Sequence, residues 1–383
     1  EQVTELLGNP QPEYIERIRY KASFNFISQL EAFILHIENT YFRAIDIKLT
    51  KHVTIPAEFI EEQFRRFHRY PMRQRFEVMT DYILEIAQIK YRIASTTDNR
   101  NMLKKAIRNM FAGNNDLLVY KDFFEWIGKS ELYKLRKNHT LEYADLAPLA
   151  YLHMALDGNK TQTQVKHLLI DEMQDYSPIQ YKVIQKLYPC RKTILGDACQ
   201  SVNPYGSSDA GMIKKAFVAG EIMKLNKSYR STYEITGFAK PDGESEVIER
   251  HGEQPRIFQY KDTVNEINAI AGFISKFRKS EFNSLGIICK EEARAFALFE
   301  SLKNDNKDIN YLSHQSTAYV NGIIVTSAHM AKGLEFDEVI IPHTDNINYK
   351  TEMDKSMLYI AVTRAMHRLT LTCSGEITGL VKI

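Results

Sequence analysis

Two adjacent carboxylates give this sequence its clearest chemical signal. In residues 165–178, VKHLLIDEMQDYSP, an apolar run leads into Asp171 and Glu172. Open α/β sheets present metal ligands and bases in this way, at the carboxyl ends of buried strands. Asp171 could hold Mg²⁺ through water, and Glu172 could orient or deprotonate a water that attacks a γ-phosphate. Ordinary strands also end on acidic pairs, so this interpretation depends on support from the rest of the chain.

Four further blocks follow in order along the chain. They are ILGDACQS at 194–201, LNKSYRST at 225–232, IIVTSAHMAKGLEFDEV at 323–339 and LYIAVTRA at 358–365. Together with LLIDEMQD they resemble the ordered motif set of superfamily 1 helicases of the UvrD/Rep type. The blocks span residues 165–365, just over half of the chain. Five partial matches in the right order are far more specific than any one of them.

The resemblance implies ATP and Mg²⁺ as cofactors and assigns three residues to the phosphates. Gln200 would sense the γ-phosphate, and Arg230 and Arg364 would act as two arginine fingers from the two sides of a cleft. A planar, permanently charged guanidinium can neutralise charge that spreads over the transferring phosphoryl oxygens. Taken alone, the two arginines could equally be surface or ion-paired residues. Ser228 stands where the family usually has Asn, which puts the positioning of Arg230 in doubt.

The same resemblance assigns three residues to the nucleoside. Tyr229 stands where the family stacks an aromatic ring on adenine, and Glu335 matches the residue that holds the ribose. Gly333 would permit close backbone approach. Glu335 could instead cap a helix or pair locally.

Three more positions match family residues that contact single-stranded nucleic acid. Tyr205 would stack on a base, which contributes roughly 1–3 kcal/mol with little sequence preference. Ser327 and His329 would touch the strand. Tyr205 could also be a plain turn residue between Pro204 and a glycine, and His329 a satisfied polar histidine. Asn203 replaces a common aromatic residue, which weakens the case for tight stacking.

The sequence contains no GxxxxGK[ST] loop, whose backbone N–H groups and lysine grip nucleotide phosphates. The nearest decoy is Gly128-Lys129-Ser130, but Phe123 stands where the first glycine should be, and the surrounding DFFEWIGKSEL reads as an amphipathic helix with a loop. The chain opens at Glu1 without methionine. We therefore expect the C-terminal part of a longer protein, lacking this Walker A segment and incompetent for hydrolysis when alone.

Composition sets broad limits on function. The 383 residues carry a formal charge of +2, so no global basic field indicates nucleic acid. Residues 61–110 hold 11 Lys and Arg against 6 Asp and Glu, which could follow a phosphate backbone or be solvated helix faces. The four cysteines lack metal or redox spacing and fit the reduced thiols of a cytoplasmic protein. No run approaches the roughly eighteen apolar residues of a membrane span, so no membrane partner is expected.

Periodicity and the resemblance together predict an α/β fold with two RecA-like parallel-sheet domains of the P-loop NTPase type, the first incomplete, and a helical accessory domain. The predicted domains are 1–140, mostly helical and inserted in the first RecA-like domain; 141–239, the C-terminal part of that domain; and 240–383, the second RecA-like domain. Pro56 and Pro71 should break the helical region. Strand candidates in the last part are RIFQY, SLGIICK, GIIVTSA, EVIIPHT and RLTLTC.

The spacing of two blocks indicates a branch of the family. UvrD/Rep proteins carry a large helical insertion after the strand that corresponds to LGIICK, whereas only about thirty residues intervene here before the block at 323–339 that contains KGLEF. This compactness resembles the HelD (helicase IV-like) branch, whose members bind RNA polymerase and use nucleotide to drive its release from nucleic acid. The alternatives are a single-stranded DNA translocase or helicase, and a non-catalytic partner-binding module. The sequence fixes neither DNA versus RNA nor the oligomeric state.

Overall fold

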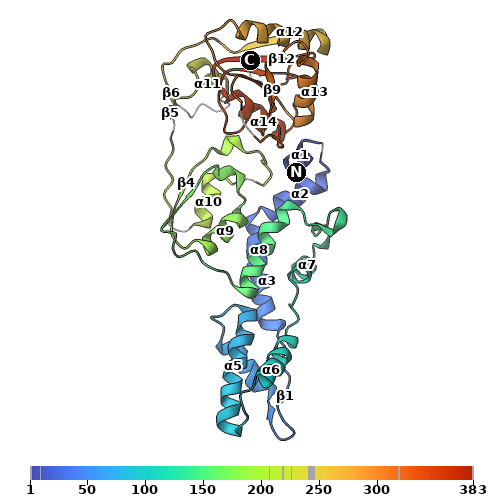
Figure 1. Ribbon diagram of the computed structural model, residues 1–383, viewed down its shortest axis with the longest axis vertical. Coiled ribbons are helices and arrows are strands. Elements are labelled where there is room, and N and C mark those ends of the chain that lie inside the picture. Colours follow the sequence, from blue (N-terminus) through green and yellow to red (C-terminus); the bar gives the residue numbers. More distant parts are fainter. Residues whose placement is uncertain are drawn as a thin grey trace.

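The chain folds into three parts that are stacked along its longest axis (Figure 1). The computed structural model describes residues 2–8, 10–206, 208–217, 220–225, 227–239, 246–317 and 320–381. A helical part lies at one end, a six-stranded sheet at the other, and a small two-stranded sheet between them. The predicted α/β class is confirmed, and the architecture is consistent with a RecA-like helicase fold.

The helical part contains most of the chain before residue 158. Its helices are α2 (Pro12–Lys21), α3 (Phe24–Thr40), α4 (Ala57–Arg66), α5 (Met72–Tyr91), α6 (Thr97–Asn109), α7 (Asp116–Trp126) and α8 (Tyr143–Asp157), whereas α1 (Gln2–Leu7) lies beside the part with the six-stranded sheet and packs into its core (Figure 1). Pro56 and Pro71 precede the first residues of α4 and α5, as predicted, because proline fits the start of a helix but not its interior. A short hairpin, β1 (Ile47–Lys48) and β2 (Thr54–Ile55), was missed.

The decoy glycine-lysine pair lies at the end of α7 rather than after a strand. α7 ends at Trp126, and Gly128 adopts a left-handed φ of 68° before a single 3₁₀ turn, η1 (Ser130–Leu132). The preceding element is the helix α6. Phe123 and Phe124 are fully buried in the aromatic core of the helical part. The prediction of a helix and loop at this place is confirmed.

Part of the basic charge at 61–110 is paired within the helical part. Arg65 pairs with Glu61 on α4, and Arg75 pairs with Glu38 of α3. Arg100 of α6 binds Asp81 of α5 at 2.7 Å. These pairs favour charged helix faces over a continuous track for phosphates.

The small sheet carries the acidic pair. It consists of β3 (His167–Ile170) and β4 (Arg191–Ile194), which run parallel, with the helices α9 (Pro178–Leu187) and α10 (Ala210–Ala216). The strand before Asp171 was predicted to be buried, and this is wrong: Leu169 is 66% exposed and Leu195, just after β4, is 44% exposed. Within the described residues β3 pairs only with β4; Ile170 packs against α9 and α10 on one face, whereas Leu169 on the other face lacks a covering layer.

The large sheet has six parallel strands in the order β7-β12-β11-β8-β10-β9. The strands are β7 (Arg256–Gln259), β8 (Leu285–Cys289), β9 (Ile309–Tyr311), β10 (Ile323–Ser327), β11 (Phe336–Ile341) and β12 (Ala365–Cys373). All five predicted strands are present. β9 was missed because three residues are too few to give a periodic signal.

Helices cover both faces of this sheet (Figure 1). Ile287 of β8 packs under α12 (Thr263–Phe277) and α13 (Glu292–Leu302). Its neighbour Ile288 faces α14 (Glu352–Val362) and α11 (Tyr233–Ala239) on the other side. A two-residue pair, β5 (Lys227–Ser228) with β6 (Glu246–Val247), precedes the sheet. The predicted domain boundary after residue 239 therefore falls behind a helix that packs on the second sheet, and residues 240–245 lie outside the described residues.

Among the described helices, none combines the length and the apolar character needed to cross a membrane.

Candidate functional site

The acidic pair lies where two loops of the small sheet meet. The loop after β3 holds residues 171–176, and the loop after β4 holds residues 195–200. Gln174, which is fully buried, joins them: its Nε2 donates to Glu172 Oε2 at 2.6 Å, and its Oε1 accepts from the N–H of Asp197 at 3.1 Å. A Cβ at Gly196 would stand 2.5 Å from the backbone nitrogen of Met173, so the close approach of these loops requires glycine.

Asp171 and Glu172 offer the hard oxygen donors that Mg²⁺ prefers. Asp171 is exposed, and its Oδ1 accepts the N–H of Glu172 at 2.8 Å. Glu172 has a left-handed φ of 53° and ψ of 50°, an uncommon conformation for a residue with a side chain. The bend turns the chain sharply after β3. The donor set therefore fits a divalent cation on the exposed side of Asp171.

Arg364, at the start of β12, reaches across to the loop after β4. Its Nη2 donates to Gln200 Oε1 at 2.6 Å, while its Nη1 and Nε donate to the carbonyls of Leu334 and Ile360 at 3.2 and 3.1 Å. The side chain is almost completely buried. Burial, together with the nearby charge of Arg230, lowers the pKa of Arg364 to about 10, which leaves the guanidinium charged at neutral pH.

Arg230 lies close to Arg364 but forms an ion pair with Glu335. Its Nη2 stands 2.7 Å from Glu335 Oε1. The charges of Glu172 and Glu335 both act on Arg364, so the candidate phosphate and ribose residues gather in one place. Tyr229 is 67% exposed next to them, and Gly333 has a φ of 82°, which favours glycine.

Lys332 is a member of the cleft to which the sequence assigned no role. It comes from the loop before β11, is 9% exposed, and its Nζ lies 2.6 Å from Asp175 Oδ2 and 3.3 Å from Glu172 Oε2. Tyr359 of α14 makes a further contact, donating to Asp197 Oδ2 at 3.4 Å. Burial and the charge of Asp197 raise the pKa of Tyr359 above its usual value, so it remains a neutral donor. The position of Lys332 within KGLEF was the available signal.

The three predicted nucleic-acid residues lie apart from this cluster. Tyr205 packs against α2, with the Arg19 guanidinium 4.9 Å from its ring centroid. Ser327 is fully buried, and its hydroxyl lies 3.2 Å from Nδ1 of His329. Burial lowers the pKa of His329, which favours its neutral form. In this conformation the Ser327 hydroxyl is closed off from a ligand.

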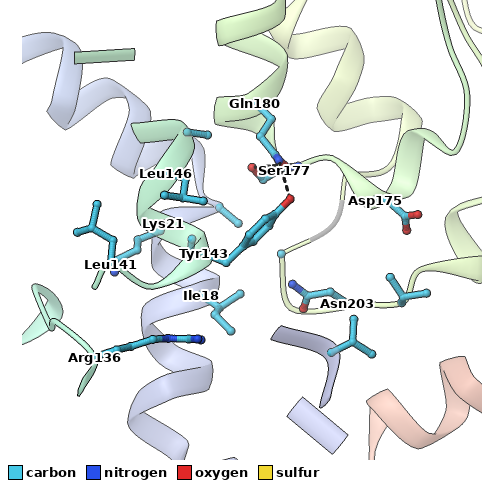
Figure 2. Close-up of a pocket in the computed structure, with 16 residues that line it drawn as sticks. Ile18, Lys21, Arg136, Leu141, Tyr143, Leu146, Asp175, Ser177, Gln180 and Asn203 are labelled. Atoms are coloured by element: carbon cyan, nitrogen blue, oxygen red, sulfur yellow. Dashed lines mark hydrogen bonds between the residues drawn. The ribbon is translucent and has the colours of Figure 1, made fainter. Parts of the chain in front are cut away.

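A separate cavity of about 560 Å³ lies between the helical part and the small sheet. Figure 2 shows Tyr143 of α8 in this cavity, with Gln180 donating to its hydroxyl at 3.4 Å. Ile18 and Lys21 of α2 line one side, and Asn203 and Asp175 the other. The cavity shares only Asp175 with the contacts around Lys332 described above.

Comparisons with known proteins identify the family of the chain. A family model described as the UvrD/REP helicase N-terminal domain matches residues 12–217, more than half of the chain. A second, described as the UvrD-like helicase C-terminal domain, matches residues 322–372. The two matches include the acidic pair, Gln200, Glu335 and Arg364.

Individual relatives are distant. A protein of Acanthamoeba polyphaga mimivirus, provisionally named ATP-dependent DNA helicase R568, is 21% identical over 77% of this chain and 48% of its own length. The ATP-dependent DNA helicase srs2 of Schizosaccharomyces pombe is 30% identical over 28% of this chain and 13% of its own length. A solved C-terminal domain of a possible DNA helicase from Lactobacillus plantarum is 28% identical, covers 40% of this chain and 92% of its own, and has a TM-score of 0.35. The chain thus spans about half or less of the length of these curated relatives. On the match over residues 12–217, the chain belongs to the UvrD/REP helicase family.

Proposed function

We propose that this chain supplies most of the ATP-hydrolysing cleft of a UvrD/Rep-type DNA helicase or translocase. One observation carries the proposal: Arg364, from the six-stranded sheet, bonds Gln200, from the two-stranded sheet, at 2.6 Å. Both are among the three residues that the family resemblance assigns to the phosphates. A guanidinium that contacts the phosphate sensor across a cleft is placed to respond when a phosphate enters.

The chemistry follows from the groups that meet there. Bound Mg²⁺ would neutralise charge on the phosphates, with Asp171 as its protein ligand. Glu172 accepts a proton from the attacking water. Arg364 and Arg230 neutralise the charge that builds on the phosphoryl oxygens. In this structure Arg364 binds Gln200 and Arg230 binds Glu335 in place of phosphate. Tyr229, exposed beside them, is placed to stack on adenine, with Glu335 and Gly333 at the ribose.

We place the phosphate loop on a segment outside residues 1–383, since the sequence contains no GxxxxGK[ST]. The uncovered apolar side chains of the small sheet support this placement. Leu169 and Leu195 are exposed, as are Met223 and Leu225, at 86% and 90%, in the segment 221–225, which has no regular secondary structure and lies outside the sheet. Parallel strands with such side chains are normally covered on both faces. We therefore expect this chain alone to hydrolyse no ATP.

Single-stranded nucleic acid is the proposed track, with Tyr205, Ser327 and His329 as its contacts. Tyr205 must exchange its stacking on Arg19 for stacking on a base. Replacing Tyr205 by alanine should weaken single-strand binding by roughly 1–3 kcal/mol and leave nucleotide affinity unchanged. The exposed Tyr91, at the end of α5, offers a matched control that should change neither.

RNA polymerase is a second candidate partner, favoured by one feature of the large sheet. Only α13 and β9 lie between β8 and β10 in the described residues. This compact connection is the property that resembles the HelD branch. A polymerase-directed motor would use the same nucleotide cleft.

The decisive experiment measures ATP turnover of this chain joined to a phosphate-loop segment, with and without single-stranded DNA. We expect turnover that Glu172→Gln abolishes and that DNA stimulates. Turnover that depends on Glu172 but ignores DNA would shift the assignment to the polymerase, and core RNA polymerase would be added next. Turnover unaffected by Glu172→Gln would refute the proposed site.

A further inference from the structure

The loop that contains Lys332 brings a third cation to the cleft, and this one contacts carboxylates rather than the phosphate sensor. Lys332 Nζ lies between Asp175 Oδ2 at 2.6 Å and Glu172 Oε2 at 3.3 Å. The lysine side chain is 9% exposed, whereas those of Glu172 and Asp175 are 42% and 31% exposed. The ammonium is therefore enclosed, unlike the mobile lysines of ordinary surface pairs.

The lysine and the carboxylates belong to different parts of the fold. Lys332 follows β10 in a turn held by the Arg364 guanidinium, which binds the carbonyl of Leu334. Glu172 and Asp175 follow β3 of the small sheet. The contact thus exists only while the two sheets face each other across the cleft.

The side chain of Glu172 depends on this contact for its place. Its other bond comes from Gln174 within the same loop. Because Glu172 and Asp175 bind one ammonium, removing that ammonium leaves two carboxylates side by side, and like charges repel. The residue proposed as the base would then move or rotate away from its present direction.

We propose that Lys332 is a positioning residue, which holds Glu172 in its working orientation only when the cleft is closed. Opening the cleft withdraws the ammonium and disorganises the base, so hydrolysis is confined to the closed state. This inference rests on the proposed function, because it gives Glu172 the role of base. The lysine itself touches neither nucleotide nor water in this role.

The first test needs no nucleotide and uses the chain as it stands. Hydrogen exchange would be measured in the loop 171–176 for the native chain and for Lys332→Met. The amides of Met173 and Asp175 are bonded to Leu195 and Glu172 carbonyls, so they report on this loop. We expect exchange there to rise by about fivefold in Lys332→Met, although the substitution lies on the other side of the cleft. A rise restricted to residues 329–335 would overturn the proposal.

Partner and control variants make the result specific. Asp175→Asn should raise exchange in the same loop. The double variant with Lys332→Met should raise it little further, since each substitution removes the same Lys332–Asp175 contact. Lys303→Met removes an exposed lysine paired with Glu300 on α13 and should leave both loops unchanged. Lys332→Arg keeps the charge and should retain protection, which guards against misfolding as the cause. Additive effects of Lys332→Met and Asp175→Asn would contradict the shared contact.

The second test applies to the protein with its phosphate loop. Lys332→Met should lower kcat by roughly tenfold to a hundredfold with KM nearly unchanged. Lys332→Arg should restore most of the rate. Normal turnover of Lys332→Met would overturn the role of Lys332, whereas loss of all Glu172 dependence would overturn the proposed function instead.

Discussion

At the scale of single residues, the two arginines that would bind the phosphates of a nucleotide already have partners within the protein. The Arg364 guanidinium bonds an amide oxygen of Gln200, and Arg230 bonds the Glu335 carboxylate. The Arg364 guanidinium is buried and needs such a partner, because an unpaired charge in a water-poor site is costly, whereas the Arg230 side chain is 39% exposed. A phosphate that enters must therefore exchange with these partners rather than find free donors.

Replacing Arg364 by lysine should separate binding from chemistry. Lysine keeps a charge but loses the planar fork that reaches Leu334, Ile360 and Gln200 together. In the protein with its phosphate loop, we expect ATP turnover to fall by at least about a hundredfold, while ATP affinity changes only a few-fold. Steady-state turnover and equilibrium nucleotide binding would be compared. Equal losses in both would mean that Arg364 binds the ground state only.

At the scale of elements, a buried ionic network fixes α2 to α8. Lys21 of α2 is 1% exposed and binds Asp145 at 2.6 Å and Glu142 at 3.3 Å. Arg17 binds Glu142 at 2.6 Å, and the Tyr120 hydroxyl donates to Asp145 at 2.8 Å. Because α8 leads directly into the strand before Asp171, this junction sets where the helical part stands relative to the small sheet.

Lys21→Met should destabilise the helical part strongly. It leaves Asp145 buried without its counter-ion, a change that typically costs about 3–5 kcal/mol. The midpoint of thermal unfolding of the helical part should drop by roughly 10 °C. It can be measured by the fluorescence of Trp126 in α7, the single tryptophan of the chain. Lys121→Met, which breaks an exposed pair with Glu125, should shift it little. Equal shifts in the two variants would show that the buried network stabilises the helical part no more than an exposed ion pair does.

Two glycines of the part that contains the six-stranded sheet, one in a strand and one in a helix, should respond to alanine in opposite directions. A Cβ at Gly286 of β8 would stand 2.6 Å from the Phe336 ring, so Gly286→Ala should cost about 1–3 kcal/mol through overpacking. Gly272 lies within α12 with no atom near its Cβ position, so Gly272→Ala should stabilise the chain by about 0.5–1 kcal/mol. Thermal unfolding followed through amide protection of β8 would measure both. A neutral Gly286→Ala would mean that the Phe336 ring moves aside freely.

The long helices and strands could be predicted from the sequence. Burial and contacts that depend on the pairing of distant segments could not. The strands of the second sheet were found because runs such as LGIIC are apolar throughout, and both faces of that sheet are covered. The same kind of run before Asp171 was interpreted as buried, yet Leu169 is exposed, because burial depends on a neighbouring layer that a strand cannot specify. That Gln200 and Arg364 lie close together was predicted only from the resemblance of the ordered motifs to those of the family. The KGLEF block marked the neighbourhood of Lys332, but its partner Asp175 could not be predicted, since no local pattern encodes a bond between residues 157 positions apart.

For the molecule as a whole, the helical part and the six-stranded sheet should respond differently to acid. In the sheet, burial alone would raise the pKa of Glu266, but hydrogen bonds from His343 and Thr372 outweigh it and hold the pKa below its usual value. The pKa of Asp354 is lowered in the same way, by the N–H groups of Lys350 and Thr351. A lowered pKa means that the unfolded state binds more protons, so the stability it contributes disappears as pH falls.

The helical part contains compensating groups instead. Burial raises the pKa of Asp145, so its protonation in acid favours the folded state. Glu142 acts in the opposite direction: burial would raise its pKa, but the hydrogen bonds and charges of Arg17 and Lys21 together outweigh this and lower it. The two effects partly cancel. On acidification, the helical part should therefore retain its structure longer than the sheet.

We accordingly expect amide protection in β8 to disappear at a higher pH than the Trp126 fluorescence transition, with both events below pH 4.5, the usual pKa of a glutamate. The carboxylates that stabilise the sheet supply stability above that pH and lose it as pH falls through their lower folded-state pKa values. Glu266→Gln cannot be protonated there, so it should flatten the acid dependence of β8 while leaving that of Trp126 unchanged. Coincident transitions in the native chain would mean that the contacts across the cleft, among them Arg364 with Gln200 and Lys332 with Asp175, bind the three parts into one cooperative unit. Loss of the Trp126 signal first would contradict the assignment of the acid-sensitive carboxylates to the sheet.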